Sequence, residues 1–234
     1  MLILSIDTSA PAGSVALLRG GGPELHTIEM ADLPGGRASE QLLPDVAAML
    51  ERHNLSRNSV ELLVIASGPG SFTGLRVAVA TVKGMAQAFG TPLVAISVLQ
   101  AVALAAGVEG RMIAVLDAQR NEVYFGEYMI TNGLAVMQRE GLAPLPEFAA
   151  SIAQQQGTIV TPDAKVAEAL NSAIAATQRT VRLVARPHAV DYARIALARH
   201  LAGEHDDPVT LDANYLRRSD AEIFAAPRLG LPKA

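Results

Sequence analysis

The sequence contains no cysteine and no tryptophan among its 234 residues. Without cysteine the chain can form no disulfide and no thiolate zinc site, and it has no cysteine nucleophile. Aromatic residues make up only 4% of the chain, so a platform that stacks the bases of single-stranded nucleic acid is not expected. The absence of cysteine is compatible with a cytoplasmic protein, which is our expectation.

Clustered positive charge and long apolar runs are also scarce. The formal net charge is −4, and Arg217-Arg218 is the one basic pair. Because contacts to phosphates require clustered Lys and Arg, this composition argues against a protein that grips nucleic acid by itself. The longest uncharged stretch, 84–108, is interrupted by glycine, proline and polar residues, so it predicts no membrane span. Residues 1–7 lack a basic start and predict a first strand, not a signal peptide.

The sequence does contain a glycine-rich loop, Ser67-Gly68-Pro69-Gly70-Ser71-Phe72-Thr73-Gly74-Leu75-Arg76. The loop follows an apolar run, 62–66, that is typical of a buried strand, and it opens a helix-compatible run, 75–89. Its glycines allow close approach to another surface, and N–H groups at a helix start favour anions. The spacing matches neither a Walker A loop, nor a dinucleotide fingerprint, nor a nucleophile elbow. The loop could hold a phosphate or a partner's backbone, or it could be a tight turn without a ligand.

The two halves of the chain repeat one plan. Leu2 to Ile6 is an apolar strand that ends at Asp7, and Met112 to Leu116 is an apolar strand that ends at Asp117, 110 positions later. In both halves a turn and a second strand follow, and helix and strand patterns then alternate. The repeat predicts two α/β lobes with mixed sheets, 1–106 and 107–210, and a C-terminal segment, 211–234, that returns to the first lobe.

Local signals place further elements along this plan. A strand is predicted over 25–30, and a helix with Ser39 as its cap and Pro44 near its start ends near His53. In the second half, Asn132-Gly133 predicts a hairpin. Helices are predicted to start at Pro146, after Thr161-Pro162-Asp163 and at Asp191, and a short strand is predicted over 158–160.

The aspartates at the two strand ends allow two interpretations. Asp7-Thr8-Ser9 could direct a carboxylate toward a metal or a water and two hydroxyls toward phosphate oxygens. Alternatively, Asp7 forms an Asx-type turn and the hydroxyls bond to the local backbone. Asp117 has the same two interpretations.

Two other patterns bear on binding. Ala80, Gly84 and Ala88 recur every four residues, so one stripe of their helix is nearly smooth; it either faces a partner or packs on the lobe's own sheet. His200 and His205 are five positions apart and do not share a helical face, so no metal site is predicted there.

Motifs along most of the chain match one family. They are Ile3-Leu4-Ser5-Ile6-Asp7-Thr8-Ser9, Ser39-Glu40-Gln41-Leu42-Leu43-Pro44, Gly68 through Arg76, Lys83-Gly84, Pro92-Leu93-Val94-Ala95-Ile96-Ser97, Asp117 with Glu122-Val123-Tyr124, and Tyr215-Leu216-Arg217. With these motifs the chain closely resembles the bacterial TsaB family, formerly called YeaZ. The matches are dense up to about Tyr128 and sparse from there to Asn214.

The resemblance implies an actin, sugar kinase and Hsp70-like (ASKHA) fold of two duplicated lobes. It also implies a non-catalytic role in forming threonylcarbamoyladenosine on tRNAs that read codons starting with A. Family members form homodimers, and they form a heterodimer with the catalytic paralogue TsaD, which carries the metal; the ATPase TsaE joins the complex, and tRNA is reached only through it. The catalytic paralogue has an H-x-x-x-H motif after the strand that matches Leu93 to Ile96, and here there is no histidine between His53 and His188.

The same resemblance suggests site residues but no catalytic residue and no metal ligand. Those expected to contact a partner or a nucleotide phosphate are Asp7, Thr8, Ser9, Gly68, Gly70, Ser71, Phe72, Thr73, Gly74 and Arg76. Those expected on interface helices are Leu42, Val46, Met49, Val77, Ala80, Gly84 and Ala88. No cofactor is certain; ATP or ADP at the partner interface is the candidate.

Two other functions stay open. An ATP-dependent phosphotransferase of the same fold would use Asp7 or Asp117 to orient Mg²⁺ and the glycine loop to hold phosphate, although Ala118-Gln119-Arg120 replaces the phosphate turn usual in the second lobe. A serine hydrolase would use Ser71, which has no histidine near it in sequence.

Overall fold

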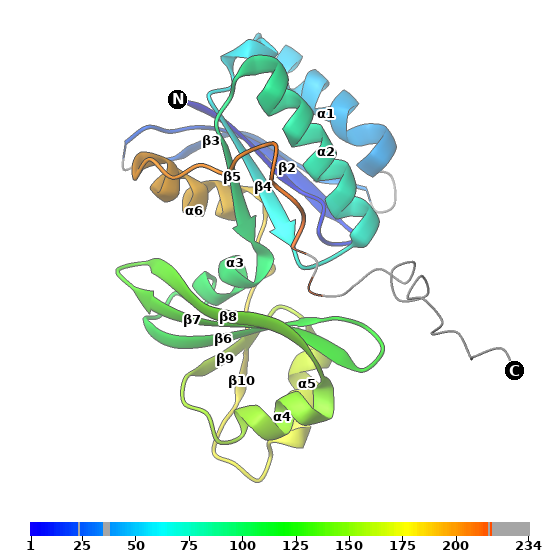
Figure 1. The fold of residues 1–234 in the computed structure, drawn as a ribbon, viewed down its shortest axis with the longest axis vertical. Coiled ribbons are helices and arrows are strands. Elements are labelled where there is room, and N and C mark those ends of the chain that lie inside the picture. The colour runs from blue at the N-terminus through cyan, green and yellow to red at the C-terminus, as the bar shows by residue number, and fades with distance from the viewer. Residues whose placement is uncertain (23, 35–37, 215, 217–234) are drawn as a thin grey trace, which may run out of the picture.

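A five-stranded mixed sheet forms the first lobe of the computed structural model, which describes residues 1–22, 24–34, 38–214 and 216 (Figure 1). Its strands are β1 (Leu2–Asp7), β2 (Gly13–Arg19), β3 (His26–Leu33), β4 (Leu62–Gly68) and β5 (Leu93–Ser97). They lie in the order β3-β2-β1-β4-β5. The first three strands pair antiparallel through short turns, and β1, β4 and β5 pair parallel.

The second sheet repeats this topology strand for strand. Its strands are β6 (Gly110–Asp117), β7 (Glu122–Thr131), β8 (Leu134–Pro144), β9 (Thr158–Thr161) and β10 (Val181–Leu183). Their order is β10-β9-β6-β7-β8, and read from the other end, β8-β7-β6-β9-β10, it matches β3-β2-β1-β4-β5 position by position. The pairs of β6, β7 and β8 are antiparallel and those of β6, β9 and β10 are parallel, as in the first sheet. The predicted duplication and the predicted mixed sheets are therefore confirmed, and the Asn132-Gly133 signal does mark the β7–β8 hairpin.

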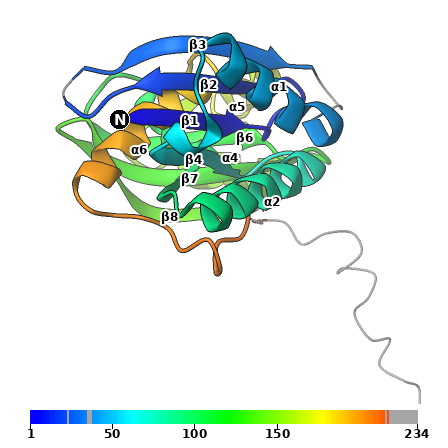
Figure 2. The same ribbon diagram turned by 90° about the horizontal axis from the view of Figure 1, so that it is seen from above.

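Helices and sheets alternate in layers (Figures 1 and 2). The helices are α1 (Ala38–Arg52), α2 (Phe72–Phe89), α3 (Val98–Leu104), α4 (Leu145–Ile152), α5 (Ala164–Ala173) and α6 (Ala189–Leu201), with a 3₁₀ turn at Arg57–Ser59. α1 and α2 cover the outer face of the first sheet, and α4 and α5 cover the outer face of the second. α3 and α6 lie between the sheets, so the central strands β1, β4 and β6 are covered on both faces.

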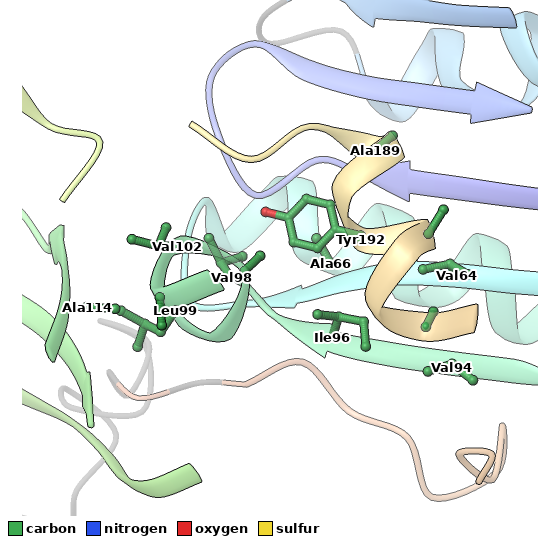
Figure 3. Close-up of a cluster of buried hydrophobic side chains, with 14 of the residues drawn as sticks. Val64, Ala66, Val94, Ile96, Val98, Leu99, Val102, Ala114, Ala189 and Tyr192 are labelled. Atoms are coloured by element: carbon green, nitrogen blue, oxygen red, sulfur yellow. The ribbon is translucent and has the colours of Figure 1, made fainter. Parts of the chain in front are cut away.

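The core between the sheets is continuous from one lobe to the other. Figure 3 shows Tyr192 of α6 beside Ala66 of β4, and Leu99 of α3 reaching toward Ala114 of β6. Continuous apolar strands such as Leu62 to Ala66 reflect this burial from both sides. The lobes therefore share one large apolar interface.

The position of α6 differs from the prediction that 107–210 forms the second lobe. This helix packs on β1, β2, β4 and β5 of the first sheet. Its buried side is lined by small residues around one aromatic, Ala189, Tyr192, Ala193 and Ala196, so it can lie close to that sheet. The first lobe therefore consists of 1–106 together with α6, a contact between distant segments that local patterns do not encode.

The C-terminal segment crosses the first lobe as far as the structure describes it. The backbone N–H of Asn214 donates to the carbonyl of Ser67 (2.7 Å), at the end of β4. Tyr215, Arg217 and Arg218 of the predicted motifs lie outside the described residues, as do residues 219–234. Among the described helices, none combines the length and apolar character needed to span a membrane.

Candidate binding site on the first lobe

Asp7 forms the Asx-type turn that was one of its two interpretations. Its Oδ1 accepts a hydrogen bond from the Ser9 N–H (2.8 Å), and the residue is only 3% exposed. Burial raises the pKa of the Asp7 carboxyl above its ordinary value of 3.8, although the hydrogen bonds with Ser9 act in the opposite direction. Asp117 repeats the turn, since its Oδ1 accepts from the Gln119 N–H (2.7 Å), but Asp117 is exposed.

The glycine-rich loop lies directly against the Asp7 turn. The Ser71 N–H donates to the Ser9 carbonyl (2.7 Å), and the Thr8 hydroxyl donates to the Gly74 carbonyl (2.7 Å). A Cβ atom at Gly74 would lie 2.0 Å from the carbonyl oxygen of Thr8, so no side chain fits there. The two loops therefore lie at one site, and the glycines serve the close approach of one backbone to the other.

This closure leaves little room for a ligand between the loops. The pocket beside them, lined by Thr8, Pro11, Ser71 and Thr73 among others, has a volume of about 80 Å³. Drug-sized ligands occupy pockets of about 300 Å³ or more, so a whole nucleotide does not fit there. The Ser71 hydroxyl accepts from the Gly74 N–H (3.3 Å) and so caps α2. This capping role accounts for Ser71 without a hydrolase mechanism.

A larger cavity, of about 1250 Å³, lies between the lobes and reaches the C-terminal segment. Its lining includes Ser97, Glu140, Arg194 and Asn214, from elements far apart in sequence. Sequence reasoning did not find Glu140 or Asn214, because neither belongs to a recognisable local motif. The predicted Tyr215-Leu216-Arg217 motif, next to Asn214, was the nearest signal.

The first turns of α2 present exposed side chains beside the closed loop. Phe72, Thr73 and Arg76 are exposed, and the Arg76 guanidinium carbon lies 3.8 Å from the centre of the Phe72 ring. Such cation–π stacking holds both side chains together at the surface. These predicted site residues are therefore available to another molecule.

The smooth stripe of α2 also faces outward. Ala80, Gly84 and Ala88 are exposed, and a Cβ atom added at Gly84 would meet nothing within 4 Å in the described part of the chain. The helix packs on its own sheet through a different side, formed by Leu75, Ala78, Val79, Val82 and Ala86. The alternative that the stripe packs inside the lobe is therefore wrong. Val77 is half-buried between the two sides.

The prediction for α1 needs a correction. Leu42, Val46 and Met49 are 1 to 3% exposed and belong to the core beneath α1 and α2. The resemblance placed them at an interface, but they form the apolar face of an amphipathic helix, and such a helix turns that face toward its own lobe. Leu43, which is 55% exposed, is the large apolar side chain that α1 presents outward.

Two histidines that do not share a helical face lie side by side. His200 and His205 are brought together, with His205 Nε2 and His200 Nδ1 2.8 Å apart, because the chain turns back after α6. Burial, and secondly His205, lower the pKa of His200. Within the described ranges, however, no three His, Cys, Asp or Glu side chains lie close enough together to hold a metal ion.

Two matching mixed sheets, stacked through a shared core and flanked by helices, define a two-lobe α/β protein with the actin-like fold. Residues 37–140 match the model of the TsaD family, tRNA N6-adenosine threonylcarbamoyltransferase. The solved structure of YeaZ from Pseudomonas aeruginosa is 25% identical and superposes with a TM-score of 0.71, covering 92% of this chain and 99% of that one.

Two curated relatives are similar over about half of the chain. Over 130 residues it is 37% identical to the tRNA threonylcarbamoyladenosine biosynthesis protein TsaB of Haemophilus influenzae, covering 54% of this chain and 53% of that one. Over 131 residues it is 34% identical to the protein of the same name in Escherichia coli, covering 55% of each. The chain thus spans about half the length of the curated relatives it matches. Together these findings show that the chain is similar to proteins of the TsaB (YeaZ) family and shares their fold.

Proposed function

We propose that this chain is a non-catalytic subunit in the formation of threonylcarbamoyladenosine on tRNAs that read codons starting with A. In this role it binds and activates the catalytic paralogue TsaD, together with the ATPase TsaE, and it forms a homodimer when TsaD is absent. The names of its relatives support the pathway. The subunit reaches tRNA only through the complex and works in the cytoplasm.

One observation carries the proposed binding role, namely the outward-facing stripe Ala80, Gly84 and Ala88 on α2. An exposed glycine within a helix costs about 1 kcal/mol of stability relative to alanine, and packing within the described chain does not offset that cost. The absence of bulky side chains along the stripe lets the backbone of another helix approach closely. The exposed Phe72 and Arg76 extend this surface toward the glycine loop. We propose this combined surface as the site for TsaD or for a second copy.

The closed loops favour a binding role over phosphotransfer. The Thr8 hydroxyl and the Ser71 N–H, which a phosphate would need, already bond to backbone carbonyls of the same chain. A phosphotransferase would have to open this contact in every cycle. The loop instead supports the start of α2 in a fixed position, which a preformed binding surface requires.

A reconstituted assay tests the proposal. The cognate adenylate-forming enzyme, TsaD, TsaE and tRNA are combined with and without this chain, and threonylcarbamoyladenosine is measured over time. We expect multiple turnover only when the chain is present, and no transfer by the chain without TsaD. Equal turnover without the chain would overturn the proposed role.

Gly84→Leu links this activity to the α2 surface. We expect the variant to fold at least as stably as the wild type, since leucine has the higher helix propensity. It should lose most of its activation and its affinity for TsaD, because a bulky side chain blocks the stripe. Ala150→Leu is the matched control, an exposed small residue on α4 at the opposite end of the molecule. Activation by Gly84→Leu equal to that by Ala150→Leu would contradict the assigned surface.

A further inference from the structure

Glu140 of β8 accepts hydrogen bonds from three separate parts of the chain. Its Oε1 accepts from the Ser97 hydroxyl (2.5 Å) and from the Tyr128 hydroxyl, and its Oε2 accepts from Asn214 Nδ2 (2.5 Å). Ser97 ends β5 in the first lobe, Tyr128 lies on β7 in the second, and Asn214 belongs to the C-terminal segment. One carboxylate therefore joins both lobes and the C-terminal segment.

Asn214 continues this connection to the glycine loop. Its backbone N–H donates to the Ser67 carbonyl (2.7 Å), and its carbonyl oxygen would lie 3.2 Å from a Cβ atom at Gly68. Gly68 in turn stands opposite Ser97 in the pairing of β4 with β5. The contacts of Glu140 and Asn214 thus meet where the glycine loop leaves the first sheet.

The residues before Asn214 connect the same segment to α2 and to the sheet edge. We call residues 206–214 the strap. Lys83 Nζ on α2 donates to the strap carbonyls of Val209 (3.2 Å) and Leu211 (2.9 Å). Asp206 makes two hydrogen bonds of 2.8 Å with the backbone of β5, one through its N–H and one through its carboxylate, and so covers the open edge of that strand. The strap therefore contacts α2, β4 and β5.

We infer that Glu140 is a positioning residue for the partner surface of the first lobe. By holding the Asn214 side chain it fixes the end of the strap, and the strap fixes the start of the glycine loop and the side of α2 that carries Lys83. Hydrogen bonds to a carboxylate are stronger than neutral ones, so one side chain can maintain this arrangement across the lobe interface. The consequence for partner binding rests on the proposed function, whereas the effect on the loop does not.

Exchanging the hydrogen-bond donor and acceptor between the side chains of Glu140 and Asn214 tests whether their contact positions the loop. Asn214→Asp places a carboxylate against the carboxylate of Glu140 and replaces attraction by repulsion. Adding Glu140→Gln to the same chain supplies an amide donor to the carboxylate introduced at position 214 and restores a hydrogen bond in the reverse direction. Tyr128→Phe is the control, because it removes a different donor to Glu140 and leaves the contact between Glu140 and Asn214 in place; the Tyr128 hydroxyl also lies 3.5 Å from the Ser97 hydroxyl.

The first measurement is amide hydrogen exchange of residues 67–76 in the full chain. We expect exchange about tenfold faster with Asn214→Asp, which corresponds to the loss of one charge-assisted hydrogen bond. The double variant should exchange within about twofold of the wild type, and so should Tyr128→Phe. Unchanged exchange with Asn214→Asp, no rescue in the double variant, or an equal increase with Tyr128→Phe would overturn the inference.

The second measurement is the affinity of the same variants for TsaD. We expect weaker binding by Asn214→Asp and recovery in the double variant. A loosened loop with wild-type affinity would overturn the link from Glu140 to partner binding. If the wild-type chain does not bind TsaD, the proposed function fails, and the exchange experiment still decides whether Glu140 positions the loop.

Discussion

The two lobes share a sheet topology and a turn, yet they use the turn differently. In both, the first strand ends at an aspartate whose Oδ1 accepts the N–H two residues later, Ser9 in one lobe and Gln119 in the other. In the first lobe the aspartate is buried, and in the second it is exposed. The difference arises from the loop that leaves the fourth strand of each sheet.

After β4 comes the glycine loop, which closes over the Asp7 turn. β9 ends at Thr161, and the residues that follow, Pro162-Asp163, include no glycine. There a side chain makes the contact, since Asp163 Oδ2 accepts from the Asp117 N–H (3.0 Å). A backbone-to-backbone contact needs glycine, whereas a contact through a carboxylate does not. The duplicated plan is therefore retained in both lobes, and only the first holds its loops together by direct backbone packing.

Gly74→Ala is expected to have the largest effect on stability, because it disrupts the direct backbone packing that distinguishes the first lobe. The added Cβ would lie 2.0 Å from the Thr8 carbonyl oxygen, so the two loops must separate. We expect a loss of about 3 kcal/mol in the free energy of unfolding. Urea denaturation measures it, with Gly84→Ala as the control, since that glycine faces open space and its replacement should gain about 1 kcal/mol. Equal stability of the two variants would contradict the packing role of Gly74.

Most of the fold could be predicted because its determinants are local. The strands ending at Asp7 and Asp117, the Asn132-Gly133 hairpin and the α4 start at Leu145, just before Pro146, all follow from short patterns. β10 was missed because three residues, Val181–Leu183, carry too little periodicity. The association of α6 with the first sheet was missed because it depends on packing between segments more than 90 residues apart. Local sequence patterns do not encode such packing.

The candidate site was predictable in its backbone but not in its surfaces. The glycine spacing indicated a close approach to another surface, and the four-residue repeat on α2 indicated a smooth stripe. The resemblance did not tell which side of α1 faces a partner, so Leu42, Val46 and Met49 were assigned to an interface although they are core. Glu140 is an isolated acid in a strand, and only the fold brings it to Asn214.

Buried acids offer a second comparison between the lobes, since Glu127 of β7 is paired with cations whereas Asp7 bonds to the backbone of its own turn. Glu127 accepts hydrogen bonds from Arg111 (2.6 Å) and Arg139 (2.6 Å). Burial tends to raise its pKa, but the two arginines outweigh burial, and the pKa lies below its ordinary value of 4.5. The ionised form is therefore favoured by folding.

Glu127→Gln should consequently lower the free energy of unfolding at neutral pH by about 1.5 kcal/mol, a modest value because both arginines are partly exposed to solvent. A lowered pKa contributes stability above about pH 4.5 that is lost as pH falls through the folded-state value. The difference between wild type and variant should therefore shrink in acid. Urea denaturation at several pH values checks this, with the exposed Glu147→Gln as control; a difference that stays constant with pH would exclude the pairing as its cause.

Asp7→Asn should have the smallest effect, and of the opposite sign. Burial raises the pKa of Asp7, so its contribution to stability declines as pH rises from 3.8 through the folded-state value. Asparagine keeps the oxygen that accepts from Ser9 and removes the buried charge, and we expect a gain of about 1 kcal/mol at pH 7. Asp117→Asn, in the exposed copy of the turn, should change stability by less than about 0.5 kcal/mol. Both variants should still activate TsaD. A stable Asp7→Asn protein that no longer supports threonylcarbamoyladenosine formation would show that the reaction requires the charge of Asp7. That result would favour the phosphotransferase interpretation.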